Sequence, residues 1–446
     1  MSDVKFSKIA QIIRERIELG EYSPGCKLPT QRVLATELDT TPATVAKAYK
    51  LLAEEGQLES FVGRGTFVCA QSELNIAIKA PEEEDNFNFS ILQPCLYKNV
   101  APLKKAYQVA GEQLTSELIG YTEFSGHEAH RLAGVKWAKH FGLEGGDTNN
   151  TVLADGAQHA LSLLINLLTK PGDTIAVESL TYPGILAIAS LAGRKVVGVA
   201  MDEQGVCPAS LETVITEHKP KLVVIVPSHQ NPTGITMPEP RRREVANIIE
   251  NHNIWLVEDD IYCFLDEKPI PAISNFVPEK AFHISSLSKA LSPAMRCGYI
   301  KAPLNQMSLL NAHIRANIWL SSPINYIAAT YLIESGEAFE IAENQRKTAA
   351  ERQAIARSIL PSIWCRATGY HIWLPLPSNW KADRLMMEAK NRGVIVSSGG
   401  YFDVNGSESE HIRLSLMSVS TEQRLEEGLN ILKELLDSET STLFPF

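Results

Sequence analysis

The chain has 446 residues, 44% of them hydrophobic and 21% charged, with a formal net charge of −10; a chain this long exceeds one compact core, so two or three globular domains are expected. No uncharged apolar run of about 18 residues occurs, and the charged N-terminus lacks the apolar block of a signal peptide, so neither a membrane span nor secretion is expected. The seven scattered cysteines contain no C-x-x-C pair, which favours reduced thiols in the cytoplasm and argues against disulfides or a metal site.

Residues 1–69 are predicted to form a small helical domain. Isoleucines recur at helical spacing near the N-terminus and predict the first helix. A second helix is predicted over about 30–38. A third is expected to begin at Pro42, with Thr41 as its cap, and to end at Gly56. QLESFVGRGTFV then predicts two short strands, which completes the plan of a winged helix-turn-helix.

The motifs LPTQRVLA, TPATVAKAYKLLAEEGQL and GRGTFV occur in this order and resemble the DNA-binding domain of the GntR regulators over nearly the whole of this segment. The resemblance implies binding to double-stranded promoter DNA, with the second helix of the motif in the major groove. It implies DNA contacts by five residues: Arg32 near the DNA backbone, Thr41, Thr44 and Lys47 on or near the reading face, and Arg64 at the wing tip.

Two features of this segment predict weak binding to a single DNA site. Pro42 and Ala46 stand where the family often has arginine. Residues 1–69 also contain nine Lys or Arg and nine Asp or Glu, whereas neutralisation of phosphates supplies much of the affinity for DNA. Paired sites in a dimer would compensate for this weakness. A winged helix that serves protein contacts is the alternative interpretation.

A linker and a large α/β body are predicted to follow. Residues 70–87 end in an acidic run without a pattern and are interpreted as a linker. From residue 88 onward, helical segments alternate with apolar runs that are typical of strands buried on both faces of a mostly parallel sheet. These runs are 151–154, 174–178, 222–226, 254–258, 281–285 and 298–302. The large part of the body is expected to extend over about 88–330, and a small α+β lobe over about 331–446.

SLSKALSPAMRCGY, residues 286–299, places a lysine among small residues in the α/β body. A lysine amine attacks aldehydes when its surroundings favour the neutral form, and its commonest purpose in such a body is a Schiff base with pyridoxal 5′-phosphate (PLP). That cofactor needs a carboxylate at its pyridine nitrogen, donors at its phenolic oxygen, N–H groups and an arginine at its phosphate, and an aromatic face. The candidates are Gly156, Ala157, Gln158, Ser286, Ser288 and Arg296 for the phosphate, Tyr182 for stacking, Asn231 and Tyr262 for the phenolic oxygen, and Asp259 for the pyridine nitrogen.

The set NPTG, EDDIY and SLSKALSPAMRCGY resembles the fold type I aminotransferases over about residues 88–446. The resemblance implies that Lys289 forms the Schiff base with PLP and that Asp259 pairs with the pyridinium nitrogen. It also implies a homodimer with shared cofactor sites, in which Tyr121 reaches the cofactor phosphate of the neighbouring subunit. Arg413, in HIRLSL, would bind the carboxylate of a substrate or effector.

A GntR-type winged helix joined to an aminotransferase-like body resembles the MocR regulators. The resemblance implies a cytoplasmic transcriptional regulator whose body serves as effector sensor and dimerisation platform. The effector would be an amino compound or PLP itself. The alternative is an active aminotransferase whose DNA-binding domain has little regulatory role, and the residues above do not exclude it. No role is assigned to His159 or His229, and residues 241–243, three arginines that open a predicted helix, are expected to form a solvated face.

Overall fold

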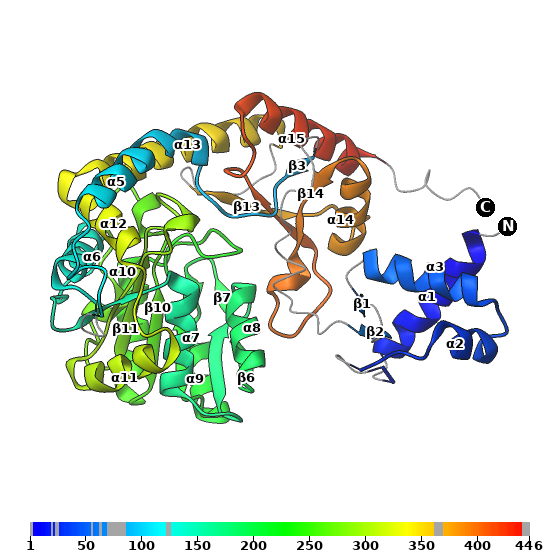
Figure 1. The fold of residues 1–446 in the computed structure, drawn as a ribbon, viewed down its shortest axis with the longest axis horizontal. Helices are drawn as coiled ribbons and strands as arrows, with labels where there is room; N and C mark the ends of the chain where they lie inside the picture. The colour runs from blue at the N-terminus through cyan, green and yellow to red at the C-terminus, as the bar shows by residue number, and fades with distance from the viewer. Residues whose placement is uncertain are drawn as a thin grey trace. The chain divides into compact units, whose positions relative to one another are not determined.

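The computed structural model describes residues 3–18, 21–22, 26–54, 57–61, 65–68, 86–121, 126–360 and 369–438. The chain divides into two compact units, residues 1–76 and 77–446, whose helices and strands are labelled in Figure 1. Most of the predicted linker lies outside the described residues. None of the described helices is long and apolar enough to cross a membrane.

The N-terminal unit contains three helices and a hairpin: α1 (Asp3–Glu18), α2 (Gln31–Glu37), α3 (Pro42–Glu54), β1 (Leu58–Phe61) and β2 (Gly65–Val68). The two strands are antiparallel, with Leu58 opposite Val68. Apolar side chains from the three helices and both strands form the core, among them the fully buried Ile13, Leu34 and Val45. The predicted helix-turn-helix region is therefore confirmed, and α3 begins at the predicted residue.

A seven-stranded mixed sheet forms the centre of the body. Its strands are β4 (Thr151–Ala154), β5 (Thr174–Glu178), β6 (Lys195–Val199), β9 (Leu222–Ile225), β10 (Trp255–Asp259), β11 (Ala281–Ser286) and β12 (Gly298–Lys301), in the order β4-β12-β11-β10-β9-β5-β6. Strand β12 runs antiparallel to both of its neighbours, and the other pairs are parallel. Six of these strands were predicted from their apolar runs. The edge strand β6 was not, because its residues are only partly buried and its sequence is correspondingly less apolar.

Helices cover both faces of this sheet. The body helices of the large part are α5 (Val100–Glu112), α6 (Glu128–His140), α7 (Ala157–Leu168), α8 (Pro183–Leu191), α9 (Pro208–His218), α10 (Glu239–Asn251), α11 (Met307–Asn317), α12 (Pro323–Ser335) and α13 (Glu337–Ile359). Apolar residues of α7, α8 and α11 pack on one face of the sheet, and those of α9 and α10 on the other. Because both faces are buried, the central strands carry continuous apolar runs, and polar side chains are concentrated where the strands end. A short ribbon, β7 (Met201–Asp202) and β8 (Gly205–Val206), lies outside the sheet.

A small lobe completes the body. It contains β13 (His371–Pro375), β14 (Val394–Ile395), β15 (Ser397–Ser398), β16 (His411–Ser415), α14 (Ala382–Asn391) and α15 (Glu422–Asp437), with the three-stranded sheet order β13-β16-β15. A strand from the beginning of the body, β3 (Phe87–Asn88), pairs in parallel with β14. The lobe is therefore built from both ends of the body, since Phe89 joins its core beside Ile372 and Leu429.

Candidate functional site

A cavity of about 150 Å³ lies among the loops that follow the strand ends of the large sheet. It brings together ten of the residues proposed from the sequence: Ala157, Gln158, Tyr182, Asn231, Asp259, Tyr262, Ser288, Lys289, Arg296 and Arg413. Its other lining residues are Ser90, Ile91, Leu92, Leu161, Pro183, Val226, Ile261, Pro293 and Phe402. Gly156, Ser286 and Tyr121 do not line it.

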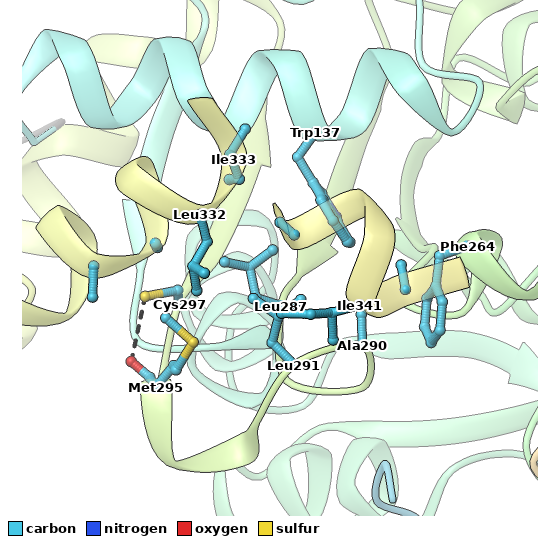
Figure 2. Packing of buried hydrophobic residues seen from close by; sticks show 14 of the residues in the cluster. Trp137, Phe264, Leu287, Ala290, Leu291, Met295, Cys297, Leu332, Ile333 and Ile341 are labelled. Atoms are coloured by element: carbon cyan, nitrogen blue, oxygen red, sulfur yellow. Dashed lines mark hydrogen bonds between the residues drawn. The ribbon is translucent and has the colours of Figure 1, made fainter. Parts of the chain in front are cut away.

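Lys289 is fixed by its neighbours in the chain. Leu287, Ala290 and Leu291 are fully buried and pack into the core shown in Figure 2, which includes residues of α12 and α13. The side chain of Lys289 itself points into the cavity, where Nζ donates a hydrogen bond to the carbonyl oxygen of Leu92 at 2.6 Å. Burial lowers the pKa of Lys289 to about 8, and the nearby Arg413 charge acts in the same direction. The surroundings therefore favour the neutral, nucleophilic amine.

Asp259 is the last residue of β10, and its carboxyl group is buried at the cavity wall. In the part of the chain that the structure describes, its Oδ1 atom has no hydrogen-bond partner. Burial raises the pKa of Asp259 to about 7, and the neighbouring Asp260 carboxylate acts in the same direction. A buried acceptor without a donor fits a protonated ring nitrogen, because such a donor would supply both the missing hydrogen bond and the missing charge.

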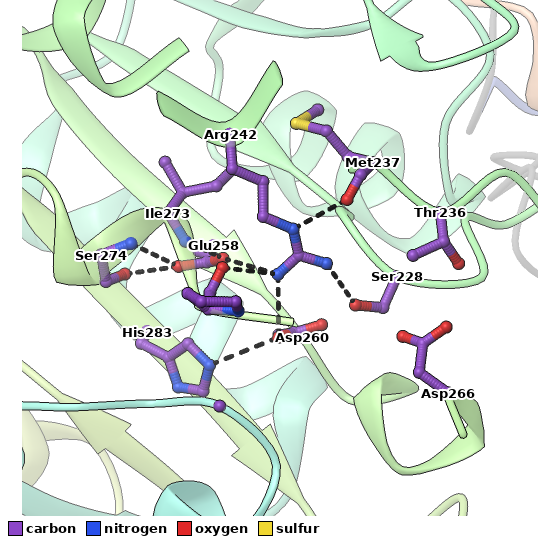
Figure 3. A network of polar contacts seen from close by, with 12 residues as sticks. Ser228, Thr236, Met237, Arg242, Glu258, Asp260, Asp266, Ile273, Ser274 and His283 are labelled. Carbon is purple, nitrogen blue, oxygen red and sulfur yellow. Dashed lines mark hydrogen bonds and ion pairs between the residues drawn. The ribbon is translucent and has the colours of Figure 1, made fainter. Parts of the chain in front are cut away.

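A buried polar network surrounds the side chain of Arg242 near the end of β10 (Figure 3). Arg242 of α10 is fully buried; its Nη1 atom lies 3.9 Å from Glu258 Oε1 and 3.8 Å from Asp260 Oδ2, and its Nη2 atom donates to Ser228 Oγ at 2.9 Å. Burial alone would raise the pKa of Asp260, but a hydrogen bond from His283 and the charge of Arg242 lower it. The prediction of a solvated face at residues 241–243 is wrong for Arg242, because helical geometry turns the middle arginine toward the sheet.

The start of α7 and the loop after Lys289 form a cradle for an anion. Gly156 precedes α7 with φ of 80°, and a Cβ atom there would lie only 2.9 Å from Arg296 Nη2. Arg296 in turn donates to the carbonyl oxygen of Asp155 at 2.6 Å, so its guanidinium lies beside the free N–H groups of the helix. Ser288 lines the cavity. Ser286 is buried outside the cavity wall, and its hydroxyl donates a hydrogen bond to the hydroxyl of Ser288 at 3.1 Å. A phosphate fits this combination of donors.

Arg413 lies on β16 and is buried at the opposite side of the cavity. Its Nη1 atom donates to Asn231 Oδ1 at 2.8 Å, and its Nη2 atom donates to the carbonyl oxygen of Ser90 and, at 3.3 Å, to Ser397 Oγ. Its guanidinium carbon lies 4.8 Å from the centroid of the Phe402 ring. Burial lowers the pKa of Arg413 to about 10. Among the described residues, no carboxylate lies within ion-pair distance of this cation, so its charge is available to a bound anion.

Tyrosines and an amide complete the walls of the cavity. Tyr182 precedes α8, and burial raises its pKa to about 12, so its hydroxyl stays protonated. Tyr262 lies with its ring centroid 5.9 Å from Lys289 Nζ, and burial raises its pKa further still. Asn231 is fixed from behind, because the preceding Gln230 donates to Glu178 Oε2 at 3.2 Å and to the carbonyl oxygen of Leu180 at 2.6 Å. Burial raises the pKa of Glu178 to about 8.

Tyr121 lies away from the cavity of its own chain. Its side chain is 83% exposed, and its ring centroid lies 5.4 Å from that of Trp319, whose ring is covered by Arg315 at 4.9 Å. The two exposed aromatic residues form an apolar surface beside the exposed Ile119. A single chain thus does not bring Tyr121 to the site.

The proposed DNA-contacting residues lie on α2 and α3. Arg32 and Lys47 are exposed, and Lys47 Nζ lies 6.0 Å from the centroid of the Phe6 ring. Thr41 Oγ1 accepts a hydrogen bond from Thr44 N at 3.3 Å, and the two threonine hydroxyls lie 2.8 Å apart. Thr41 therefore caps α3, as predicted from the sequence. Arg64, predicted at the wing tip, lies outside the described residues.

Several cavity residues were not predicted from the sequence. Ser90 and Leu92 contribute main-chain carbonyl oxygens, which leave no side-chain signal in a sequence. Phe402 belongs to a short 3₁₀ helix, η6 (Gly399–Phe402), and its ring contacts Trp373 of β13, with the ring centroids 5.9 Å apart, a contact that the sequence does not reveal. Gln230 does not line the cavity but fixes Asn231, and it could have been recognised because it directly precedes Asn231 in a polar run at a strand end. His159 and His229 stay outside the cavity: His159 Nδ1 accepts from Asp155 N at 3.0 Å, and His229 Nε2 lies 3.2 Å from Asp266 Oδ1.

Comparisons with known proteins divide the chain in the same way. Residues 5–68 match the bacterial regulatory proteins of the gntR family, and residues 84–432 match aminotransferase class I and II. The HTH-type transcriptional regulator YdeF of Bacillus subtilis is 30% identical, over 98% of this chain and 95% of that protein. The HTH-type pyridoxine biosynthesis transcriptional regulator PdxR of Corynebacterium glutamicum is 27% identical, over 89% of this chain and 88% of that protein. Among solved structures, the α-aminoadipate aminotransferase LysN of Thermus thermophilus has a TM-score of 0.74 and 22% identity, over 82% of this chain and 95% of that chain.

Proposed function

This chain belongs to the MocR-type GntR regulators, in which a helix-turn-helix region is fused to an aminotransferase-like domain, and we propose that it binds PLP and an amino-carboxylate effector in one cavity of that domain. The coarse function, an HTH-type transcriptional regulator, follows from the family. The binding of the cofactor and of the effector is what we propose beyond the family. The aminotransferase class I and II fold is typically PLP-dependent, which supports the cofactor.

One observation carries this proposal. Two basic groups, the partly buried Lys289 and the buried Arg413, line the same cavity, and Asp259 presents an unsatisfied acceptor to it. A cavity with a nucleophilic amine, a guanidinium that has no carboxylate partner among the described residues and an orphaned carboxylate oxygen is complementary to an aldehyde-bearing pyridine and to a molecule that carries an amine and a carboxylate. In a purely structural cavity the orphaned Asp259 oxygen and the uncompensated Arg413 charge would be unfavourable.

Each residue has a separate task in this proposal. PLP, when bound, supplies an aldehyde that exchanges between amines and a ring that withdraws electrons. Lys289 provides the amine that holds it, Asp259 keeps the proton on its ring nitrogen, and Tyr182 covers its face. Ser288, Arg296 and the start of α7 bind its phosphate, while Asn231 and Tyr262 provide donors to its phenolic oxygen. Arg413 binds the carboxylate of the effector.

The assembly and the DNA contacts are also part of the proposal. The exposed Tyr121 and Trp319 support a homodimer in which Tyr121 reaches the cofactor phosphate of the neighbouring subunit. A dimer would carry two winged helices, and paired half-sites would raise the low affinity expected of one neutral domain. Arg32, Thr44 and Lys47 are proposed to contact promoter DNA, with Thr41 placing the start of α3.

An active aminotransferase is the second candidate function. Two observations favour it: Lys289, Asp259 and Arg413 line one cavity, and the pKa of the lysine amine is lowered. Catalysis of amino transfer would require both. The two functions differ in turnover, because a sensor needs the effector to be bound and an enzyme needs it to be consumed.

DNA binding and turnover together distinguish these functions. We expect the dimer to bind a DNA fragment from upstream of its own gene, measured by fluorescence anisotropy, with an affinity that changes when PLP or an amino acid is added. A response to PLP alone would identify the cofactor as the signal, whereas a response that also requires an amino acid would identify an amino-acid sensor. Keto acid formation over many turnovers, without specific DNA binding, would establish the enzyme instead.

The lysine assignment has its own test. Reduction of the PLP-treated protein with borohydride, followed by peptide mass spectrometry, should place one phosphopyridoxyl group on Lys289. The Lys289→Ala variant should fold but lose this label. A label on a different lysine of the wild-type protein would show that the wrong residue has been assigned.

A further inference from the structure

Residues 86–92 lead from the linker into the cavity. They are the first residues that the structure describes after the 70–85 segment, and their outer half is bound to the small lobe through the main chain. Phe87 N donates to the carbonyl oxygen of Gly393, and Phe89 N to that of Ile395, both at 2.8 Å. The Arg424 guanidinium of α15 covers the Phe87 ring at 4.7 Å and donates to the carbonyl oxygen of Asn86 at 3.3 Å.

The inner half of this segment is bound to both basic groups of the cavity. The carbonyl oxygen of Ser90 accepts from Arg413 Nη2, and the carbonyl oxygen of Leu92 accepts from Lys289 Nζ at 2.6 Å. The side chain of Asn88 sets this geometry, because its Oδ1 atom accepts from Ser90 N at 2.9 Å and from Ser90 Oγ at 2.7 Å. One short segment thus contacts the two nitrogen groups to which the proposed function assigns ligands.

A ligand and this segment compete for the same donors. A carboxylate is a stronger acceptor than an amide carbonyl, so an effector at Arg413 would take the Nη2 donor from Ser90. A Schiff base at Lys289 Nζ would remove both N–H hydrogens of the neutral amine, which leave with the aldehyde oxygen as water, so the hydrogen bond to Leu92 would be lost. Buried carbonyl oxygens that lose a donor are unfavourable, and the segment would shift to regain partners. Ligand binding and the bound position of residues 86–92 are therefore alternatives, which is the condition for coupling two sites.

We propose that residues 86–92 form a ligand-responsive connector: occupancy of Lys289 and Arg413 releases the carbonyl oxygens of Ser90 and Leu92, and the released segment alters the C-terminal end of the linker that joins the body to the winged helix. This inference rests on the proposed function, because it requires ligands at Lys289 and Arg413. It adds the route by which their binding reaches the DNA-binding unit.

Hydrogen–deuterium exchange of the full-length protein tests the connector. The probes are PLP, whose aldehyde engages Lys289, and N-(5′-phosphopyridoxyl)-L-alanine, which has no aldehyde and engages Arg413 through its carboxylate. Peptides that cover residues 86–92 should exchange about fivefold faster with either probe, the population change expected for the loss of one net hydrogen bond. Borohydride labelling of Lys289, measured in parallel, separates the two levels of the argument. Absence of the label overturns the proposed function and the connector with it; a label without faster exchange overturns the connector alone.

Variants at Asn88 test the coupling to DNA. Asn88→Ala removes the acceptor that orients Ser90, so its ligand-free exchange should match that of the ligand-bound wild type, and the ratio of DNA dissociation constants with and without PLP should fall to one. Asn88→Asp keeps an acceptor oxygen and should restore the wild-type ratio. Asn150→Ala is the matched control, because Asn150 is also buried and also accepts a main-chain N–H, at 2.8 Å from Asp147, but lies before β4. If Asn88→Ala folds and keeps the wild-type ratio of DNA dissociation constants, the connector is overturned. If that variant does not fold, the hydrogen–deuterium exchange of the wild type decides whether the connector exists.

Discussion

The pH dependence of cofactor attachment at Lys289 follows directly from the burial of its amine. With a pKa of about 8 in place of the ordinary 10.5, about one tenth of the amine is neutral at pH 7. An ordinary lysine would be neutral in only about one molecule in 3,000, so the site should hold roughly 300 times more nucleophile at that pH. Because only the neutral amine attacks an aldehyde, the rate constant for attachment should rise with pH up to about 8 and then level off.

Stopped-flow absorbance measures this profile. Apoprotein is mixed with excess PLP between pH 6 and pH 10 at constant ionic strength, and each rate constant is divided by that of Nα-acetyl-lysine in the same buffer to remove the titration of PLP itself. The ratio should stay near its maximum of about 300 from pH 6 to pH 7, be about half of that at pH 8, and fall steeply above pH 8. In Asp259→Asn the midpoint should move below that of the wild type, because the Asp259 charge favours the protonated lysine. A rate constant that keeps rising to pH 10 would show that the amine titrates normally and would refute the reasoning.

Three further predictions concern the anion site, a buried acid and the DNA contacts. Arg413→Gln should weaken N-(5′-phosphopyridoxyl)-L-alanine binding by about 10- to 100-fold in a displacement titration, the range for a lost charge-assisted hydrogen bond, while PLP attachment at Lys289 persists; equal loss of both would contradict the assignment. Burial raises the pKa of Glu178 from 4.5 to about 8, so the folded state binds this proton more tightly, and the free energy of unfolding should fall as pH rises between these values. Glu178→Gln lacks this dependence, so its free energy of unfolding, relative to that of the wild type, should rise by roughly 3 kcal/mol between pH 5 and pH 7.5 in urea titrations. A difference between the two proteins that does not change with pH would refute this. Arg32→Ala should weaken specific and non-specific DNA binding alike and reduce the salt slope by about one, whereas a sequence-dependent loss would assign Arg32 to base contacts.

Much of the fold could be predicted because local and long-range preferences agree. The start of α3 was found at Pro42 from its cap and its first-turn proline, and six sheet strands were found because burial on both faces makes them continuously apolar. The edge strand β6 is exposed enough to lose that signal. The pairing of β3 with β14 joins residues more than 300 positions apart in the sequence, and two residues carry no pattern that could reveal it.

The site was predictable where chemistry requires a particular side chain. Asp259 ends β10, Lys289 lies in the loop after β11 and Arg413 lies in the middle of β16, and the structure gathers them around one cavity. Main-chain acceptors such as that of Leu92 are invisible in a sequence, since any residue could provide them. Arg242 shows the opposite error: a charge that looks solvated in the sequence is buried, because its partners Glu258 and Asp260 lie at the end of β10, against which α10 packs.

The antiparallel strand β12 has a mechanical consequence for the whole body. The loop that carries Lys289 is anchored at one end to β11 and at the other to β12, and both strands lie inside the same sheet. Its apolar residues are packed in the core besides, so this wall of the cavity can yield little. Arg413, by contrast, belongs to a lobe with a separate three-stranded sheet. When one ligand contacts both Lys289 and Arg413, we expect the lobe to move and the Lys289 loop to stay in place. The lobe is also the part that β3 joins to the linker of the winged helix.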